Sequence, residues 1–274
     1  MFRPLCCGAA ALFLSPLAQA AQEALPLWEL GAVGGVVSTP AYPGAARQST
    51  RALALPFLIY RGKVVRADQS GINARLLNSD VLEADIGLAA SLPARSNDVA
   101  ARAGMPDLGT LLEFGPRLKV RLADPTPTTR LRLDLPLRAV MEMRGGVRHQ
   151  GYTFEPKLVA EMRDPGGKWN ADASAGVVFG DRRINAYFYE VRPAFATPER
   201  PAYDAAAGLM LTRVGIYGSR LVNADVRIFG FMRYESYAGA ANRASSLMKR
   251  STGASAGFGL AWTLRRSAQP AAGN

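Results

Sequence analysis

The sequence predicts an all-β fold, an antiparallel transmembrane β-barrel of about 12 strands. Apolar and polar residues alternate with a period of two through most of the chain, as in strands with one apolar and one polar face. These segments run for roughly 11 to 15 residues, the length that a strand needs to cross a bilayer at a tilt. Strands of soluble sheets average about five or six residues, so a periplasmic sandwich is the weaker alternative. Aromatic residues also collect near the segment ends, as in an interfacial girdle: Trp28, Tyr60, Tyr152, Trp169, Tyr217, Tyr234 and Trp262.

The N-terminal residues 1–20 have the layout of a secretory signal peptide. Arg3 precedes an apolar stretch over residues 5–17, and Ala18-Gln19-Ala20 is typical of a cleavage site. Both cysteines of the chain lie in this segment, so the mature protein is expected to have no disulfide and no thiol chemistry. We expect the barrel to cover residues 21–264 and a C-terminal tail to cover residues 265–274.

Twelve strands account for the alternating segments. We expect them at residues 27–38, 50–60, 63–69, 71–78, 81–92, 110–122, 129–143, 152–163, 168–180, 205–217, 220–234 and 252–264. No amphipathic helix of about ten residues or more interrupts this pattern. The third and fourth strands are short and would also fit one bent strand, and Arg213 in the tenth falls on the apolar side.

The lengths of the connections alternate along the chain. Short turns are expected at residues 61–62, 78–80, 123–128, 164–167 and 218–219, and the long segments are 39–49, 93–109, 181–204 and 235–251. Outer-membrane barrels have short periplasmic turns and long outer loops. The alternation therefore supports the barrel and assigns the long segments to the outer side. Segment 181–204 is rich in aromatic residues and is expected to be either an exposed recognition surface or a lid folded into the lumen.

The polar faces of the expected strands carry a network of opposite charges. Its expected members are Glu83, Asp85, Glu113, Arg117, Lys119, Arg121, Arg130, Arg132, Asp134, Arg138, Glu155 and Glu161. In a barrel of this size, interleaved Arg and Glu side chains either fill the lumen or leave a thin, anion-preferring channel. The formal charge of +11 is therefore explained by lumen and rim residues, and a secreted chain is not expected to bind nucleic acid.

Catalytic and metal-binding patterns are weak in this sequence. The single histidine, His149, is expected in an exposed loop, and no serine or acidic motif accompanies it as a hydrolase would require. One histidine and no mature cysteine leave only carboxylates as metal ligands. The carboxylate pairs would suit glycan hydrolysis, but the many arginines on the same face favour ion pairing. We therefore expect no enzyme activity, no cofactor and no metal.

Several short motifs, in order, resemble the MipA/OmpV family of outer-membrane proteins. The first is residues 28–35 followed by Pro40-Ala41-Tyr42-Pro43-Gly44, and the second is residues 56–62, which end in Tyr60-Arg61-Gly62. Residues 187–191, 203–208, 241–247 and 257–262 continue the resemblance over essentially the whole mature chain. Two features depart from the family: Ser245-Ser246-Leu247 stands where Ser-Pro-Leu is usual, and the chain ends in a tail instead of an aromatic residue.

The resemblance implies an outer-membrane barrel in a Gram-negative envelope. It further implies a non-enzymatic scaffold that links a murein lytic transglycosylase to a murein synthase in peptidoglycan assembly. A small pore, or an adhesin or envelope-stress protein, is the alternative. Outer-membrane lipid and lipopolysaccharide are the other expected partners, with Arg47, Arg95, Arg102 and Arg243 at the outer rim suited to lipopolysaccharide phosphates.

Overall fold

A computed structural model describes residues 25–62, 65–68, 71–91 and 93–271 of the chain, so the expected signal peptide lies outside the described residues. Within these residues the strands are β1 (Trp28–Pro40), β2 (Gln48–Arg61), β3 (Val65–Asp68), β4 (Gly71–Asn78), β5 (Leu82–Ser91), β6 (Thr110–Thr126), β7 (Thr129–Met143), β8 (Val147–Phe154), β9 (Lys157–Arg163), β10 (Trp169–Gly180), β11 (Gly208–Leu221), β12 (Val226–Ser236) and β13 (Thr252–Arg266). One α-helix, α1 (Arg182–Tyr189), and three short 3₁₀ helices lie in the connections; they are η1 (Ser96–Asp98), η2 (Ala100–Arg102) and η3 (Pro193–Phe195). No described helix has the length and apolar content needed to cross a membrane.

All of these strands belong to one antiparallel sheet that closes on itself. β1 pairs with β13, and the other strands follow in chain order around the ring. β8 and β9 each pair with both β7 and β10, so they act as two halves of one wall strand, interrupted at Glu155 and Pro156. The ring therefore has twelve wall positions, which confirms the expected antiparallel barrel of about 12 strands.

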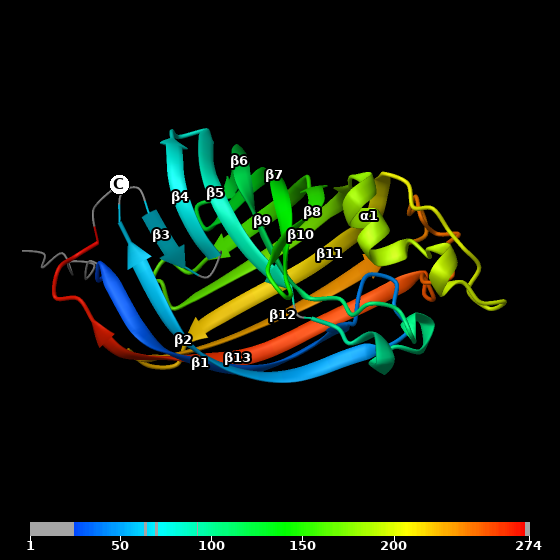
Figure 1. Ribbon diagram of the computed structural model, residues 1–274. Helices are drawn as coiled ribbons and strands as arrows, with labels where there is room; N and C mark the ends of the chain where they lie inside the picture. The colour runs from blue at the N-terminus through cyan, green and yellow to red at the C-terminus, as the bar shows by residue number, and fades with distance from the viewer. Residues whose placement is uncertain (1–24, 63–64, 69–70, 92, 272–274) are drawn as a thin grey trace, which may run out of the picture.

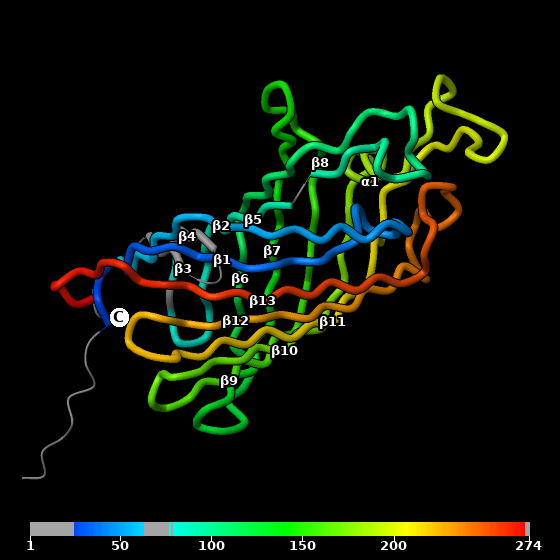
Figure 2. Tube along the Cα trace, turned by 90° about the horizontal axis from the view of Figure 1, so that it is seen from below, coloured from blue at the N-terminus to red at the C-terminus, as the bar shows by residue number. Residues whose placement is uncertain are grey.

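The two ends of the barrel differ in structure. The long segments 41–47, 93–109, 181–207 and 237–251 gather at the loop end, and α1 belongs to the third of them (Figure 1). At the terminal end the strands are joined by short turns. The first and last strands run side by side, and the first and last described residues, Leu25 and Ala271, pair at the terminal end (Figure 2). The expected alternation of long and short connections is therefore present.

The last described residues do not form a free tail. Arg265 and Arg266 belong to β13, two residues beyond the expected barrel boundary. The following residues pair with the start of the chain, where the Leu27 amide donates to the Gln269 carbonyl at 2.9 Å and the Ala271 amide donates to the Leu25 carbonyl at 2.7 Å. Residues 265–271 of the expected tail thus continue the β1–β13 ladder at the terminal end.

Several expected strand boundaries were wrong. β6 continues to Thr126, so the turn expected at residues 123–128 is reduced to residues 127–128. The turn expected at residues 218–219 lies at residues 222–225, where the Asn223 side chain accepts from the amides of Asp225 and Val226. Gly218 and Ser219 instead continue β11, since glycine within a barrel wall does not require a turn. The strand expected to begin at residue 152 begins at Val147, because Gly145 and Gly146 adopt positive φ and form a tight turn after β7.

Gly115 permits close contact between β6 and β7. A Cβ atom at this position would lie 2.1 Å from the carbonyl oxygen of Leu137 on the neighbouring strand. We expect Gly115→Ala to separate these strands and to lower the yield of folded barrel severely. Gly218→Ala is the matched control, since its Cβ would meet only the Asn170 carbonyl at 3.9 Å. The altered electrophoretic mobility of unheated, folded barrel measures this yield, and equal yields would contradict the prediction.

Candidate functional site

The lumen-facing side chains form two walls of different chemistry. Directly opposite residues of paired strands share one face, and the buried ion pairs identify which face is inside. The wall from β5 to β11 carries most of the charges. The wall from β12 through β13 and β1 to β2 carries mainly glycine, aliphatic and aromatic residues, with a few charged residues toward its two ends. Large apolar side chains such as Phe258 and Ile216 lie exposed on the opposite, outer face.

The first charge cluster joins β5 and β6. The Arg117 guanidinium donates two hydrogen bonds to the Asp85 carboxylate, at 3.0 and 2.7 Å. The Lys119 ammonium lies 2.9 Å from both Glu83 and the same Asp85. Asp85 is 1% exposed, so this carboxylate is fully withdrawn from water and depends on the two cations for its stability as an anion.

Two further clusters continue around the same wall. Arg132 pairs with Asp134 at 2.7 Å and with Glu161, which Arg163 also contacts. Nearer the loop end, Glu155 lies at the centre of the third cluster. It accepts from Arg138 at 3.2 Å and from Arg213 at 2.9 Å, and Arg213 continues the network to Glu235 on β12.

Most of the expected charge network is therefore brought together in space. Glu113 joins the third cluster through Arg138 at 3.6 Å. Arg121 and Arg130 do not join the network; they lie at the terminal end, where both contact the exposed Asp124. The expected network lacked Glu235, Lys157 and Tyr237. Lys157 lies 3.9 Å from Glu155, and the Tyr237 hydroxyl donates to Glu235 at 2.6 Å. The alternation of Arg227, Arg233 and Glu235 along β12 was the available signal for Glu235, but the expected strand stopped at residue 234.

Arg213 faces the lumen and not the lipid. It stands opposite Gly176 on β10 and Glu235 on β12, both on the inner face. From the sequence, Arg213 fell on the apolar face of its strand. The reason is a register irregularity between Val178 and Phe179 of β10, which shifts the inward and outward alternation near the beginning of β11. The guanidinium reaches Glu155 across β10 because Gly176 has no side chain; a Cβ there would lie 2.6 Å from the Pro156 carbonyl oxygen.

The apolar wall is built from aromatic rings packed over inward-facing glycines. Phe57 on β2 occupies the space beside Gly31, and Phe231 on β12 occupies the space beside Gly257. Along β2 the register places Leu53 opposite Gly35 and Leu55 opposite Val33, so both leucines face the lumen with Phe57. They are 39% and 56% exposed, and the sequence analysis did not anticipate them.

The loop end is closed by a cap with its own apolar core. α1 begins at Asp181, whose carboxylate accepts from the Ile184 amide at 2.9 Å. The helix lies against Gly151, where a Cβ would be 2.7 Å from the Ile184 nitrogen. Two clusters of buried residues form the cap core: Leu111, Val140, Val178, Ile184, Tyr189, Ala205, Met210, Leu211, Tyr237 and Ala240 in one, and Tyr42, Ala45, Ala94, Val99 and Leu108 in the other.

Hydrogen bonds join the separate loops within this cap. The Tyr189 hydroxyl donates to the Pro43 carbonyl at 3.2 Å, and Ser245 Oγ donates to the Tyr189 carbonyl at 2.7 Å. The Tyr42 hydroxyl donates to the Leu247 carbonyl at 2.7 Å. The serine-containing segment 245–247 is thus fixed by buried contacts without the family's usual proline.

The family motif residues occupy two separate places. Pro40, Tyr42, Pro43 and Gly44 lead from β1 into the cap, and the Gly44 carbonyl accepts from the amides of Lys249 and Arg250 at 2.8 and 3.0 Å. Gly44 has φ of +82°, which favours glycine. Tyr60, Arg61 and Gly62 lie at the terminal end, where Arg61 pairs with Glu29 at 2.6 Å. The motifs therefore stabilise both ends of the barrel.

Segment 181–204 contributes both a lid and an exposed surface. α1 packs into the cap, whereas residues 192–202 project from the loop end (Figure 1). Arg200 fastens the projection by donating to the carbonyls of Ala101 and Ala103 at 3.2 and 3.0 Å. Arg102, expected at the rim, is buried beneath this segment and donates to the Phe188 carbonyl at 3.1 Å. The burial arises because the loops fold over it, which alternation cannot reveal.

The stability of the cap is expected to fall at alkaline pH because the phenol of Tyr42 is buried there. Burial raises the pKa of its phenol to about 12, although nearby Arg102 lowers it somewhat. The unfolded phenol ionises near pH 10, so the contribution of Tyr42 is complete below pH 10 and is lost as pH rises to 12. We expect wild type to lose on the order of 2 kcal/mol more than Tyr42→Phe over this interval. Chemical unfolding at each pH measures the difference, and parallel pH profiles would contradict it.

His149 lies on strand β8 and not in an exposed loop. Its ring packs edge-on against Tyr152, with ring centroids 4.8 Å apart, and its Nδ1 lies 3.5 Å from Arg183. Its Nε2 is buried without a hydrogen-bond partner in the described structure.

Within the same described residues no group of three or more histidine, cysteine or acidic side chains is arranged to hold a metal.

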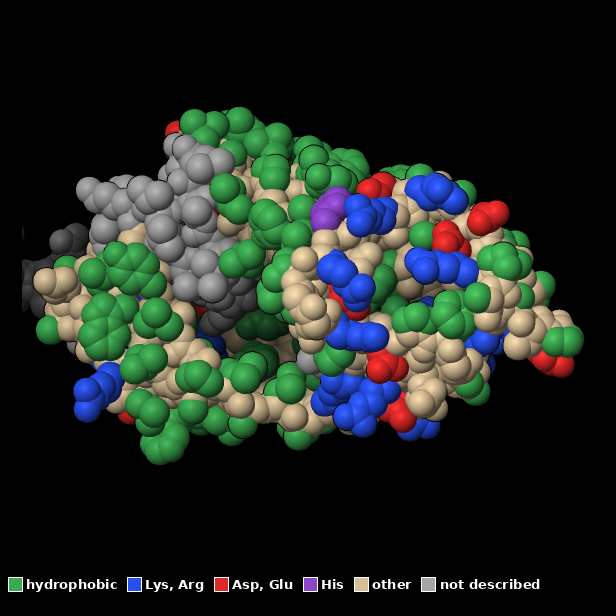
Figure 3. Space-filling model, in the orientation of Figure 1, with side chains coloured by type: hydrophobic (Ala, Val, Ile, Leu, Met, Phe, Trp, Pro, Cys, Tyr) green, Lys and Arg blue, Asp and Glu red, His purple; other side chains and the backbone are tan. Residues whose placement is uncertain are grey.

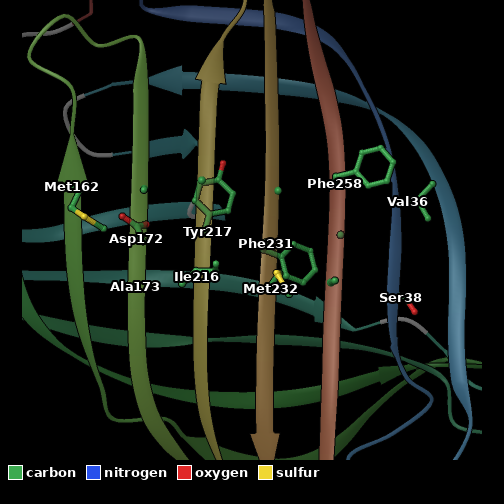
Figure 4. A pocket seen from close by; sticks show the side chains of 15 residues that line it. Val36, Ser38, Met162, Asp172, Ala173, Ile216, Tyr217, Phe231, Met232 and Phe258 are labelled. Carbon is green, nitrogen blue, oxygen red and sulfur yellow. The ribbon is translucent and has the colours of Figure 1, made fainter.

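A shallow groove of about 690 Å³ crosses the outer face of the wall. Register places Ala171, Gly218 and Gly230 side by side along its floor. Met162, Ile216, Met232 and Phe258 surround it (Figure 4). Because these residues belong to the outward-facing set, the groove lies on the lipid-facing surface and is separate from the lumen.

Residues 30–264 match the family described as MltA-interacting protein MipA. The chain belongs to the MipA family. The match begins within β1 and ends within β13, and it makes this chain an outer-membrane protein. No curated protein matches the chain.

Solved barrels resemble the chain only distantly. A NanC porin is 12% identical with a TM-score of 0.40, covering 86% of this chain and 100% of that chain. A bacterial polysaccharide outer membrane secretin is 9% identical with a TM-score of 0.43, covering 88% and 99%. Outer membrane phospholipase A from Escherichia coli is 10% identical with a TM-score of 0.36, covering 88% and 95%. With TM-scores this low, the fold assignment stands on the strand pairings of this chain.

Proposed function

We propose that this MipA-family barrel is a non-enzymatic scaffold that binds a murein lytic transglycosylase and a murein synthase at its terminal end. The family membership carries the proposal, since the family is described by its interaction with MltA. In the outer membrane the terminal end would face the periplasm, as the short turns of such barrels do. That end is where murein enzymes have access to the chain.

The terminal end has the character of a protein-binding rim. Its backbone is ordered by pairing between the chain ends, and the Ser267 amide donates to the Trp28 carbonyl at 2.9 Å. Exposed apolar side chains occur on separate segments around this rim, including Leu25, Val81 and Val222, each about 60% exposed. Apolar residues on an ordered, polar rim are typical of protein interfaces.

Affinity capture from solubilised envelopes tests the scaffold directly. We expect the tagged wild-type barrel to recover both classes of murein enzyme, and Val222→Asp at the terminal end to reduce their recovery about fivefold or more. Val147→Asp is the matched control, because Val147 is equally exposed, at 60%, but lies at the loop end. Failure of wild type to recover either enzyme, or equal losses in the two variants, would contradict the proposal.

Lipopolysaccharide contact is proposed for the opposite end. Arg47, Arg95 and Arg243 are exposed there, and guanidinium groups pair well with phosphate oxygens. We expect Arg47→Gln combined with Arg95→Gln to weaken binding of lipopolysaccharide to the purified barrel at low salt. Unchanged retention of lipopolysaccharide by this double variant would remove those residues from the proposal.

An adhesive function is the second candidate, favoured by the projection of residues 192–202. This segment is exposed, although Arg200 holds its base. Replacing residues 193–199 with a short Gly-Ser linker tests this function while Arg200 is kept. Loss of cell attachment with intact murein-enzyme capture would support the adhesin, and unchanged attachment would exclude that segment.

A further inference from the structure

Among the described residues, the pairing that closes the ring is confined to the terminal end between β2 and β5, and the wall is interrupted there toward the loop end. Only Tyr60 and Arg61 of β2 pair with β3, and β4 pairs with β5 only from Glu83 to Gly87. Within the described residues, the rest of β2 has a strand neighbour only on its β1 side. Figure 3 shows the surface hollowed on this face of the barrel, with apolar side chains inside the hollow.

This unpaired part of β2 lies at the depth of the lipid chains. Ala52 stands opposite Val36, which in turn stands opposite Phe258, and both of these side chains are exposed on the outer wall. An open sheet edge is tolerated at that depth only where it lines a water-filled cavity or is covered. No described strand pairs with this edge, so the interruption leaves an opening between the outer surface of the wall and the lumen.

The side chains inside the opening are suited to an amphiphile. Leu53, Leu55 and Phe57 present a continuous apolar face on β2, and Phe229 and Phe231 extend it on β12. Toward the loop end the same wall carries two arginines. Arg51 donates to the Pro93 carbonyl, and the Arg233 guanidinium lies 5.7 Å above the Phe231 ring. Among the described residues neither arginine lies within 4 Å of a carboxylate, and the charges of Glu235, Glu155 and Glu113 act on Arg233 from a greater distance.

We propose that this opening admits an amphiphile with one anionic head group and a long acyl chain from the surrounding leaflet into the lumen. The acyl chain contacts Leu53, Leu55 and Phe57, and the head group pairs with Arg233 near the loop end. A ligand bound in this way has the same head-to-tail orientation as the lipids of the outer leaflet, whose head groups lie toward the loop end. The proposal uses the membrane orientation given above but does not require a murein-enzyme partner.

Binding of the fluorescent fatty acid cis-parinaric acid to the detergent-solubilised barrel provides the test. We expect saturable binding to wild type, and Leu55→Trp, which fills the lumen side, to weaken it about tenfold. Leu58→Trp is the matched control, because Leu58 lies on the same strand with the same 56% exposure but faces outward. Absence of saturable binding to wild type, or equal binding by the two tryptophan variants, would overturn the proposal.

Further measurements test the head group and remove the dependence on variant folding. Arg233→Gln should weaken fatty-acid binding about fivefold while leaving competition by the uncharged alcohol of equal chain length unchanged. Equal effects on acid and alcohol would overturn the assigned pairing.

A diazirine-labelled fatty acid should cross-link wild type on the lumen face of β2. Adducts found only in the outer groove would overturn the site. A second copy of the chain or a peptide bound along β2, without saturable fatty-acid binding, would also overturn it. Unchanged enzyme capture by Leu55→Trp separates this test from the scaffold test.

Discussion

Asp85→Asn is expected to lower the free energy of unfolding by about 3 kcal/mol or more. The substitution removes the buried charge that Arg117 contacts through two hydrogen bonds and that Lys119 contacts at 2.9 Å. Both cations then lose a compensating anion inside the wall, where desolvation of a charge is costly. Chemical unfolding in detergent micelles, followed by tryptophan fluorescence, measures the change.

Asp124→Asn is the control for this prediction. Asp124 also pairs with an arginine, but its side chain is 37% exposed at the terminal end. An exposed pair of this kind contributes little to stability, because water screens the attraction between its charges. Replacing Asp85 and Arg117 together by leucine and methionine should restore much of the loss, because the pair is removed as a unit and Lys119 keeps Glu83. Equal destabilisation by Asp85→Asn and Asp124→Asn would contradict the importance of the buried cluster.

Tyr189→Ala is expected to open the cap and to destabilise the protein by about 3–5 kcal/mol. Tyr189 is 0% exposed in the larger cap cluster, and its hydroxyl connects α1 to Pro43. Removing the ring leaves a cavity where the loops meet, so α1 loses its main support. In planar bilayers we expect wild type to conduct little, because the cap and the ion pairs obstruct the lumen, and we expect this variant to conduct several times more.

Tyr234→Ala makes the same change outside the cap. Tyr234 is 51% exposed on the outer wall, so its removal leaves no buried cavity and should leave the conductance unchanged. The pair also tests the pore alternative. A wild-type conductance as large as that of Tyr189→Ala would show that the cap does not obstruct passage, and would favour the small pore over a closed scaffold.

The sequence predicted the barrel and most of its charge network for a local reason. A strand that separates lipid from a polar interior must alternate every second residue, so Glu83, Asp85, Arg117 and Lys119 are recognisable without a structure. The same rule was wrong near Arg213 and Gly218. There a register irregularity and wall glycines changed the pattern without changing the composition.

By itself the sequence determined that the chain is a period-two barrel of about 12 strands, with long loops at one end and the motifs of the MipA family. Only the tertiary structure decided that Arg102 is buried, that α1 closes the loop end, and that Leu53 and Leu55 face the lumen beside an interrupted wall. Alternation specifies two faces for each strand, but it does not specify how far neighbouring strands pair. The lengths of the hydrogen-bonded ladders and the packing of distant loops against one another determine where the wall opens and what the cap covers.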